Sequence, residues 1–134
     1  MAATVRRVTA FRVTLGDRVG AMADVLAAAR NAGIDLQSVA GYVCGSEGVI
    51  LAVPKDLQKS RPAAVSAPWA LGEQDVFLVE GDDERGALCG IAEKLAAAKV
   101  SIQAAYAVAV ESRFGAVIAV APEDVDRAAE ALGV

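Results

Sequence analysis

The chain has 134 residues, enough for one ordinary domain or for two very small domains that share a core. Its 13 basic and 17 acidic residues give a net charge of −4, so we expect no basic surface that neutralises phosphates and no nucleic-acid partner. Histidine is absent, which removes the commonest general base and the commonest metal ligand. We therefore expect no enzyme: no catalytic residue, no metal and no cofactor.

The N-terminal stretch lacks an uninterrupted apolar run after its arginines, and no apolar run approaches the roughly 20 residues that cross a bilayer. We expect no membrane association and a cytoplasmic location. The two cysteines, Cys44 and Cys89, each stand in apolar sequence without a CxxC partner. The sequence predicts that both are reduced and buried as small hydrophobic side chains.

The first predicted elements are a strand, a helix and a hairpin. Apolar residues alternate at Phe11, Val13 and Leu15, which is the period of a half-buried strand. From Val19 the apolar residues follow a helical stripe that closes at residues 31–33. The stretches "IDLQSVAGYVCG" and "GVILAV" then predict a hairpin with its turn at residues 45–47.

The remaining elements repeat this order. Pro62 and Pro68 predict that the next helix is short or broken. The strand "DVFLVE" (75–80) ends the first set of elements and begins a second, which contains a helix, a hairpin and a final helix opening at Pro122. In this last helix the acidic residues 123 and 124 lie at the positive end.

The chain is an internal repeat. One constant shift along the sequence aligns Phe11 with Phe77, Asp17 with Asp83, and Gly20 with Gly86. A one-residue adjustment then places "GVILAV" (48–53) on "GAVIAV" (115–120). Two units completed by a shared strand predict an α+β fold of the ferredoxin-like βαββαβ kind, with an antiparallel sheet and helices on one face. We place the first unit at 1–72 and the second at 73–134.

The exposed face of the predicted sheet carries small apolar residues. Depending on the register, these are Ala105, Ala107 and Ala109, or their alternates Ala104 and Val108. Either set predicts that something packs against this face.

Each copy has an Asp where a strand gives way to a helix, with a Gly three residues later. One interpretation is structural: Asp17 and Asp83 cap their helices, and the glycines allow close helix packing. The other is that the free amides of a helix N-terminus hold a small carboxylate while the Asp holds an ammonium group. Together these two groups would bind an α-amino acid by both of its charged ends.

The order of elements, with "GDRVGAMADVLAAARNAGIDLQSV" and its echo "GDDERGALCGIAEKLAAAKVSIQAA", resembles two tandem ACT domains over nearly the whole chain. The resemblance implies a ligand held where two ACT units meet, by the loop before the first helix and the start of the second strand. Carried over by position, the ligand-binding residues are Asp17, Arg18, Val19, Gly20, Ala21, Met22, Asp35 and Leu36 in the first copy, and Asp83, Arg85, Gly86, Ala87, Leu88, Ser101 and Ile102 in the second.

The chain departs from the family pattern in this loop. ACT domains that bind serine tend to have Asn in the loop and at the strand start, whereas Asp17 and Asp35 stand here. The Pro that often precedes the Gly is replaced by Val19 and Arg85. Arg85 is either a solvated side chain or a bidentate partner for a ligand carboxylate. The identity of the ligand therefore stays open.

The resemblance implies an amino-acid-binding regulatory protein, a homodimer that acts by shifting an assembly or on a regulated enzyme partner. The alternative is a ligand-free scaffold that uses the same dimer surface. Acylphosphatases share the ferredoxin-like arrangement, but the Asn that should accompany a phosphate-binding Arg18 is missing from the start of the second strand.

Overall fold

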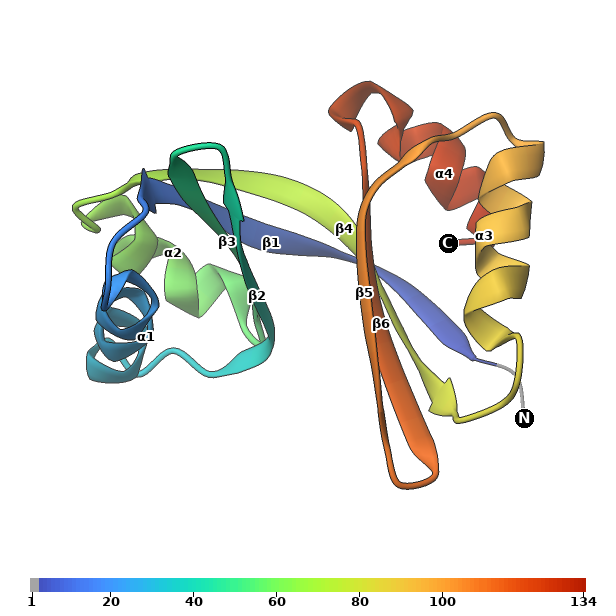
Figure 1. The fold of residues 1–134 in the computed structure, drawn as a ribbon, viewed down its shortest axis with the longest axis horizontal. Helices are drawn as coiled ribbons and strands as arrows, with labels where there is room; N and C mark the ends of the chain where they lie inside the picture. Colours follow the sequence, from blue (N-terminus) through green and yellow to red (C-terminus); the bar gives the residue numbers. More distant parts are fainter. Residues whose placement is uncertain (1–2) are drawn as a thin grey trace. The chain divides into compact units, whose positions relative to one another are not determined.

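The computed structural model describes residues 3–134 and divides them into two compact units (Figure 1). The first unit contains residues 9–74, and the second contains residues 3–8 with residues 75–134. Strands β1 (Thr4–Gly16) and β4 (Ala70–Asp82) each contribute one half to each unit. The division in β4 falls two residues after the boundary placed at 72/73, and residues 3–8 group with the second unit.

The first unit is a βαββαβ arrangement. After its half of β1 come α1 (Ala21–Asn31), β2 (Leu36–Cys44), β3 (Glu47–Pro54), α2 (Leu57–Val65) and the first half of β4. The strands lie in the order β2-β3-β1-β4, and β3 pairs antiparallel with both β1 and β2. Helix α2 is short, as Pro62 and Pro68 predict, although it continues past Pro62 to Val65.

The second unit has the same arrangement with residues 3–8 as its fourth strand. It contains the second half of β4, α3 (Ala87–Ala97), β5 (Ile102–Val110), β6 (Arg113–Val120), a 3₁₀ turn η1 (Pro122–Asp124) and α4 (Val125–Leu132). Its strands lie in the order β1-β4-β6-β5, and β6 pairs antiparallel with β4 and β5. The predicted α+β fold with antiparallel pairing is confirmed.

The repeat has a constant offset, the one that takes Phe11 to Phe77. Every bound of β1, α1, β2 and β3 recurs at this offset in β4, α3, β5 and β6. The register agrees, since Phe11 pairs with Ala52 and Phe77 with Ile118. The one-residue adjustment is therefore wrong: Phe114, and not Gly115, corresponds to Gly48. Matching glycines in an Ala- and Val-rich stretch misleads, whereas strand pairing determines the register.

The helices of each unit cover one face of its sheet. In the second unit, Leu95 of α3 and Ala128 of α4 pack in one cluster with Phe77 and Ile118. Since Ala105 pairs with Ile118, residues 105, 107 and 109 lie on the helix side. Ala104 and Val108 are therefore the pair on the opposite face, where Val117 of the neighbouring strand is buried.

Helices α1 and α3 begin at glycines in the left-handed region. Gly20 has φ +87° and Gly86 has φ +80°, and no side chain caps either helix. Of the two interpretations of Asp17 and Asp83, the one that makes them helix caps is therefore wrong. Their backbone N–H groups instead donate to the hairpin turns, to the carbonyls of Ser46 at 3.3 Å and Ser112 at 2.7 Å. The glycines are needed for this positive φ and not for close packing, because the nearest atom to an added Cβ at Gly20 lies 3.9 Å away.

A side-chain cap is present on α2, where Asp56 Oδ1 accepts from the N–H of Lys59 at 3.1 Å. We expect Asp56→Ala to lower the free energy of unfolding by about 1 kcal/mol. Asp17→Ala should change it by less than about 0.5 kcal/mol, because that side chain caps nothing. Urea unfolding of the two variants checks this, and an equal loss in both would contradict it.

The backbone requirement at Gly86 can be separated from packing by comparing it with Gly90 inside α3. An added Cβ meets no atom within 4 Å at either position. We expect Gly86→Ala to destabilise the protein by about 1 kcal/mol, because alanine is strained at positive φ. Gly90→Ala should stabilise it by roughly 0.5–1 kcal/mol, because alanine loses less entropy in a helix. Thermal unfolding measures both, and a shift in the same direction for both would contradict this account.

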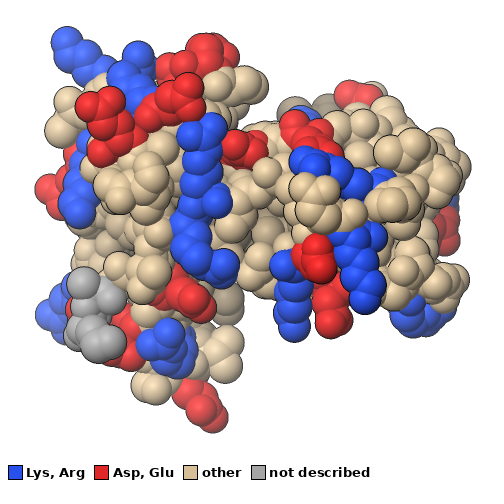
Figure 2. Space-filling model, turned by 180° about the vertical axis from the view of Figure 1, so that it is seen from behind, with Lys and Arg blue, Asp and Glu red and all other residues tan. Residues whose placement is uncertain are grey.

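Charges of both signs are interspersed on the face of the molecule seen in Figure 2. Among the described residues, no helix is long and apolar enough to cross a membrane.

Candidate functional site

The loop between β1 and α1 forms one wall of a surface hollow in the first unit. Asp17, Arg18, Ala21 and Met22 lie on the loop side. The other walls are the hairpin end of β2 and β3, with Gly41, Tyr42, Val43 and Gly48 among their residues. The hollow measures about 240 Å³. Asp17 is held at its edge because its N–H bonds to the turn of the same hairpin.

The second unit has a hollow at the corresponding place. It is lined by Asp83, Glu84, Gly86, Ala87, Leu88 and Cys89 on the loop side and by Ala107, Val108, Ala109 and Phe114 on the hairpin side, and it measures about 320 Å³. All of these positions except Gly86 and Cys89 correspond in the repeat to a lining residue of the first hollow. The repeat therefore extends from the sequence to a surface feature.

Each hollow lies beside a helix N-terminus with open amides. In α1 the amides of Ala21 and Asp24 donate to the carbonyls of Arg18 and Gly20, whereas no residue the structure describes accepts from Met22 or Ala23. In α3 the amides of Leu88 and Cys89 are open in the same way within residues 3–134. Open amides at the positive end of a helix dipole suit an anionic group.

The charged side chains around the two loops differ. In the first unit the Arg18 guanidinium pairs with Asp24 on α1 and donates to the carbonyl of Val19, so it is committed to the protein. In the second unit Arg85 is exposed and has no partner among residues 3–134. Arg85 does not line the hollow beside Asp83, but borders a separate one that it shares with Lys94.

The side-chain carboxylates of Asp17 and Asp83 have no hydrogen-bond or ion-pair partner among the described residues, unlike that of the neighbouring Asp82. The side chains of Asp17 and Asp83 are exposed and make no hydrogen bond or ion pair with any described residue. The adjacent Asp82, by contrast, accepts from Arg113 at 2.8 Å. Both aspartates are therefore available to a ligand. Val19 is wholly exposed at the tip of the first loop.

The structure does not bring the loops and the second-strand starts together within a unit. Helix α1 has 11 residues and is therefore about 16 Å long, and Asp35 lies beyond its far end, where its carbonyl accepts from the N–H of Lys55. Leu36 lines the apolar core. In the second unit Ile102 packs against the core and Ser101 precedes it.

Sequence reasoning missed the hairpin side of both hollows. Tyr42, Val43 and Val108 are 40%, 57% and 63% exposed and lie at the ends of β2 and β5 next to the turns. The signal was present in the predicted hairpin. The strand residues next to a hairpin turn lie close to any loop that bonds to that turn.

The prediction of buried cysteines is wrong. Cys44 and Cys89 are both exposed, the first at the end of β2 and the second on α3. Cys89 lines the second hollow, and its Sγ donates to Glu93 Oε1 at 3.5 Å, one helical turn away. This hydrogen bond, with the negative charge of Glu93, raises the pKa of the Cys89 thiol. Among residues 3–134 no group of three or more Cys, Asp or Glu could hold a metal ion.

Cys89 offers a chemical probe of the second hollow. In a Cys44→Ser background, we expect Glu93→Gln to increase the rate at which iodoacetamide alkylates Cys89 at pH 8. Removing the carboxylate lowers the thiol pKa and so increases the thiolate fraction. Glu123→Gln, at the start of η1, is the matched control and should leave the rate unchanged. Equal rates in the parent and in Glu93→Gln would contradict the assigned contact.

No protein-family model matches the chain, and the search of curated proteins finds no match. Solved structures do resemble it. Protein BT0572 from Bacteroides thetaiotaomicron has a TM-score of 0.80 at 20% identity, over 96% of this chain and 88% of that one. The regulatory subunit of aspartate kinase from Thermus flavus has a TM-score of 0.60 at 17% identity, over 99% and 95%. E. coli aspartokinase III in complex with lysine and aspartate gives 0.55 at 16%, over 96% and 31%.

These likenesses establish the fold. Aspartate kinase regulatory subunits are ACT-domain proteins, and this chain matches one over almost its whole length. The predicted fold, two ACT-like units in tandem, is confirmed.

Proposed function

We propose that this protein binds a small amino acid, held where two ACT-like units meet, and that binding serves regulation. One observation carries the proposal: each unit presents an uncapped helix N-terminus, with two open amides, beside an exposed and unpartnered Asp. The protein keeps this arrangement twice although a capping side chain would stabilise each helix by about 1 kcal/mol.

The chemistry of the loop fits both ends of an α-amino acid. The open amides of Met22 and Ala23, or of Leu88 and Cys89, hold the carboxylate. Asp17 or Asp83 holds the ammonium group. The start of the second strand of another unit, Asp35 with Leu36 or Ser101 with Ile102, completes the site. Since the loop and the strand start come from different units, the ligand requires that two units meet.

The solved structures support a regulatory role. One that resembles this chain is the regulatory subunit of an aspartate kinase, and another is an aspartokinase in complex with lysine and aspartate. We propose that this protein is a cytoplasmic regulator without catalytic residues. It forms a homodimer, and the ligand acts by favouring one assembly, or one state of a separate enzyme partner.

The two loops are not equivalent in this proposal. Arg18 is neutralised by Asp24, so the negative charge of Asp17 dominates the first loop. The second loop carries the unpartnered Arg85. The two sites therefore bind with unequal affinity, and the first favours the more cationic ligand.

A second function is supported by exposed apolar residues at the hairpin ends. Val43, Val108 and Val110 are 57%, 63% and 65% exposed. A scaffold that docks through these ends would need no small molecule, because burying apolar area provides the affinity.

A thermal-shift screen against the twenty amino acids at millimolar concentration distinguishes these functions. A ligand at 100 times its Kd adds about 2.7 kcal/mol to stability, which for a chain of this size raises the midpoint by several degrees. We expect one amino acid to do so, and Asp17→Ala or Asp83→Ala to abolish the rise.

The aspartate variants are well suited to this test because neither side chain caps a helix. Their midpoints without ligand should match the parent. Asp56→Ala, which loses a true cap, is the matched control: its midpoint falls, but its response to the ligand stays. If no amino acid raises the parent midpoint, amino-acid binding is refuted and the scaffold is favoured.

A further inference from the structure

The second unit has a further surface hollow, separate from the one beside Asp83. It measures about 550 Å³, and all of its lining residues belong to the second unit. The lining comes from the first half of α3, the start of β1 and the end of α4, and it includes Ala87, Gly90, Ile91, Ala3, Val5 and Leu132. A hollow of this size is large enough to hold a small molecule.

Two cations, Arg85 and Lys94, also line this hollow, which we call the cationic hollow. Both are exposed, and neither side chain makes a hydrogen bond or an ion pair with any of residues 3–134. By contrast, Arg113 of the same unit is paired with Asp82 at 2.8 Å. Glu84 is the only acidic side chain among the described lining residues. The lining side chains therefore carry an excess of positive charge, which favours an anionic ligand.

The two cations lie near opposite ends of one helix face. Ala87, Gly90, Ile91 and Lys94 are three or four residues apart, so they share a face of α3. Lys94 lies two turns, or about 10 Å, along the helix axis from Ala87, and Arg85 comes before the helix begins. A molecule with an anionic group at each end matches this separation better than a single anion does.

Gly90 leaves the helix face bare between the two cations. A glycine inside a helix lowers stability relative to alanine, because it loses more conformational entropy on folding. Neither packing nor backbone geometry requires it here, since an added Cβ would meet no atom within 4 Å and Gly90 is not among the glycines at positive φ. The missing side chain gives a ligand direct access to the surface between Arg85 and Lys94.

The first unit has neither cation at the corresponding positions. It has Val19 and Ala28 there, and Asp24 in place of the helix glycine. Asp24 is paired with Arg18. The residues that favour an anion in the second unit are therefore not retained in the first.

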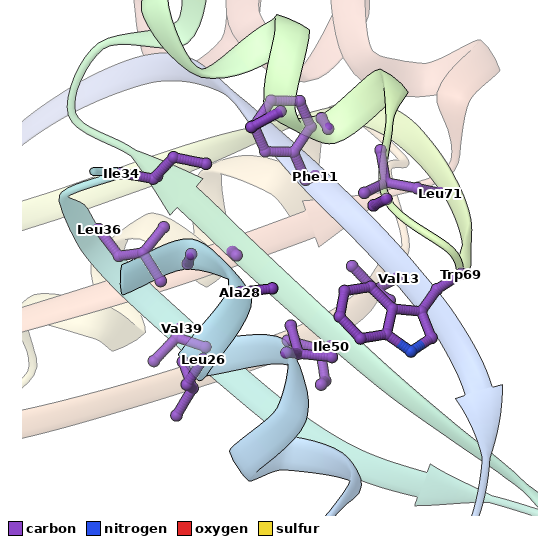
Figure 3. Close-up of a pocket in the computed structure, with 16 residues that line it drawn as sticks. Phe11, Val13, Leu26, Ala28, Ile34, Leu36, Val39, Ile50, Trp69 and Leu71 are labelled. Atoms are coloured by element: carbon purple, nitrogen blue, oxygen red, sulfur yellow. The ribbon is translucent and has the colours of Figure 1, made fainter. Parts of the chain in front are cut away.

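The first unit also has larger side chains at the start of its fourth strand. Trp69 and Leu71 correspond in the repeat to Ala3 and Val5, which line the cationic hollow. Figure 3 shows Trp69 beside Val13, and both Trp69 and Leu71 pack against the core of the first unit. No charged residue lines the apolar pocket drawn in that figure. Because Ala3 and Val5 are smaller, they leave room in the second unit for a ligand.

We propose that the cationic hollow binds a small dicarboxylate, a short hydrocarbon chain with a carboxylate at each end. The Arg85 guanidinium donates to one carboxylate in a bidentate pair, and the Lys94 ammonium donates to the other. The hydrocarbon chain lies over Gly90 and contacts the apolar side chains of Val5 and Leu132. Two charges and an apolar lining together select this class of ligand over a simple inorganic anion.

This site differs in chemistry from the proposed amino-acid site. The two hollows of the second unit share Glu84, Gly86 and Ala87, but Asp83 lines only the amino-acid hollow and Arg85 lines only the cationic hollow. A dicarboxylate without an ammonium group has nothing that an unpartnered Asp can bind. Either proposal can therefore fail without the other.

Glutarate is the probe, because it has two carboxylates on a short chain and no ammonium group. We expect isothermal titration calorimetry of the purified chain at low ionic strength to show saturable glutarate binding. Valerate, which has the same number of carbon atoms but one carboxylate, should bind about tenfold more weakly because it pairs with one cation only. Inorganic phosphate should also bind about tenfold more weakly, since it makes no apolar contact.

Charge variants test the two cations. Arg85→Gln and Lys94→Gln should each weaken glutarate binding by about fivefold or more, because each removes one of the two charge-assisted pairs. Arg85→Lys keeps the charge but loses the bidentate geometry, and it should weaken binding by an intermediate factor. Lys55→Gln makes the same change of charge at an exposed lysine of the first unit, and this matched control should bind glutarate as the parent does.

A steric variant tests the location without changing the charge. Gly90→Gln places a side chain between the two cations and should abolish saturable glutarate binding. Since an added Cβ meets no atom at this position, the thermal midpoint of Gly90→Gln should not fall below that of the parent. Ala96→Gln, at an exposed position of the same helix, should leave glutarate binding unchanged.

Three results would overturn the proposal. The first is the absence of saturable glutarate binding by the parent. The second is an equal affinity for glutarate and for valerate or phosphate, because any anion would then serve. The third is parent-like binding in Gly90→Gln, or a loss in Lys55→Gln as large as that in Lys94→Gln. Asp17→Ala should leave glutarate binding unchanged, which separates this site from the amino-acid site.

Discussion

Neither unit of this protein has a complete sheet without a strand that continues into the other unit. Strand β4 begins in the first unit and ends in the second, and β1 does the reverse. Within the single six-stranded sheet, each unit obtains its fourth strand in this way. A cut between two consecutive domains, as at residues 72 and 73, would leave both units with an incomplete sheet and an unpaired strand edge. The tandem arrangement is therefore a requirement for each unit to have a complete set of strands.

The two copies are alike at one end and differ at the other. The loop and hairpin end keeps an uncapped helix, an exposed Asp and a hollow in both units. The core differs. The second unit has Leu95 and Ile118 where the first has Ala29 and Ala52, and the last helix of the first unit, α2, contains Pro62. The features that carry the proposed binding function are thus retained twice, whereas the packing of the core differs between the copies.

Much of the fold could be predicted from the sequence, because it depends on short-range patterns. The alternation at Phe11, Val13 and Leu15 and the change of period after Val19 correspond to β1 and α1. The predictions failed where tertiary contacts, and not the local sequence, determine the structure. An Asp three residues before a Gly matches a capping pattern, but the backbone turn at Gly20 takes the cap position and leaves Asp17 outside the helix. Cys44 and Cys89 stand in apolar sequence, yet both are exposed, because Cys44 lies at the end of a strand and Cys89 on an exposed face of a helix.

The site was harder to predict than the fold, because its residues are brought together by the hairpin. Nothing near Asp17 in the sequence points to Tyr42; the pairing of β2 with β3 and the bond from Asp17 to the Ser46 carbonyl bring them to one hollow. The constant offset between the two copies adds a historical consequence. Surface loops tolerate insertion at small entropic cost, so duplicated segments ordinarily come to differ in loop length. Over the stretch from β1 to β3, the two copies differ at many residues but have the same length. The turns in this stretch therefore have the same number of residues in both copies, although several of the residues within them differ.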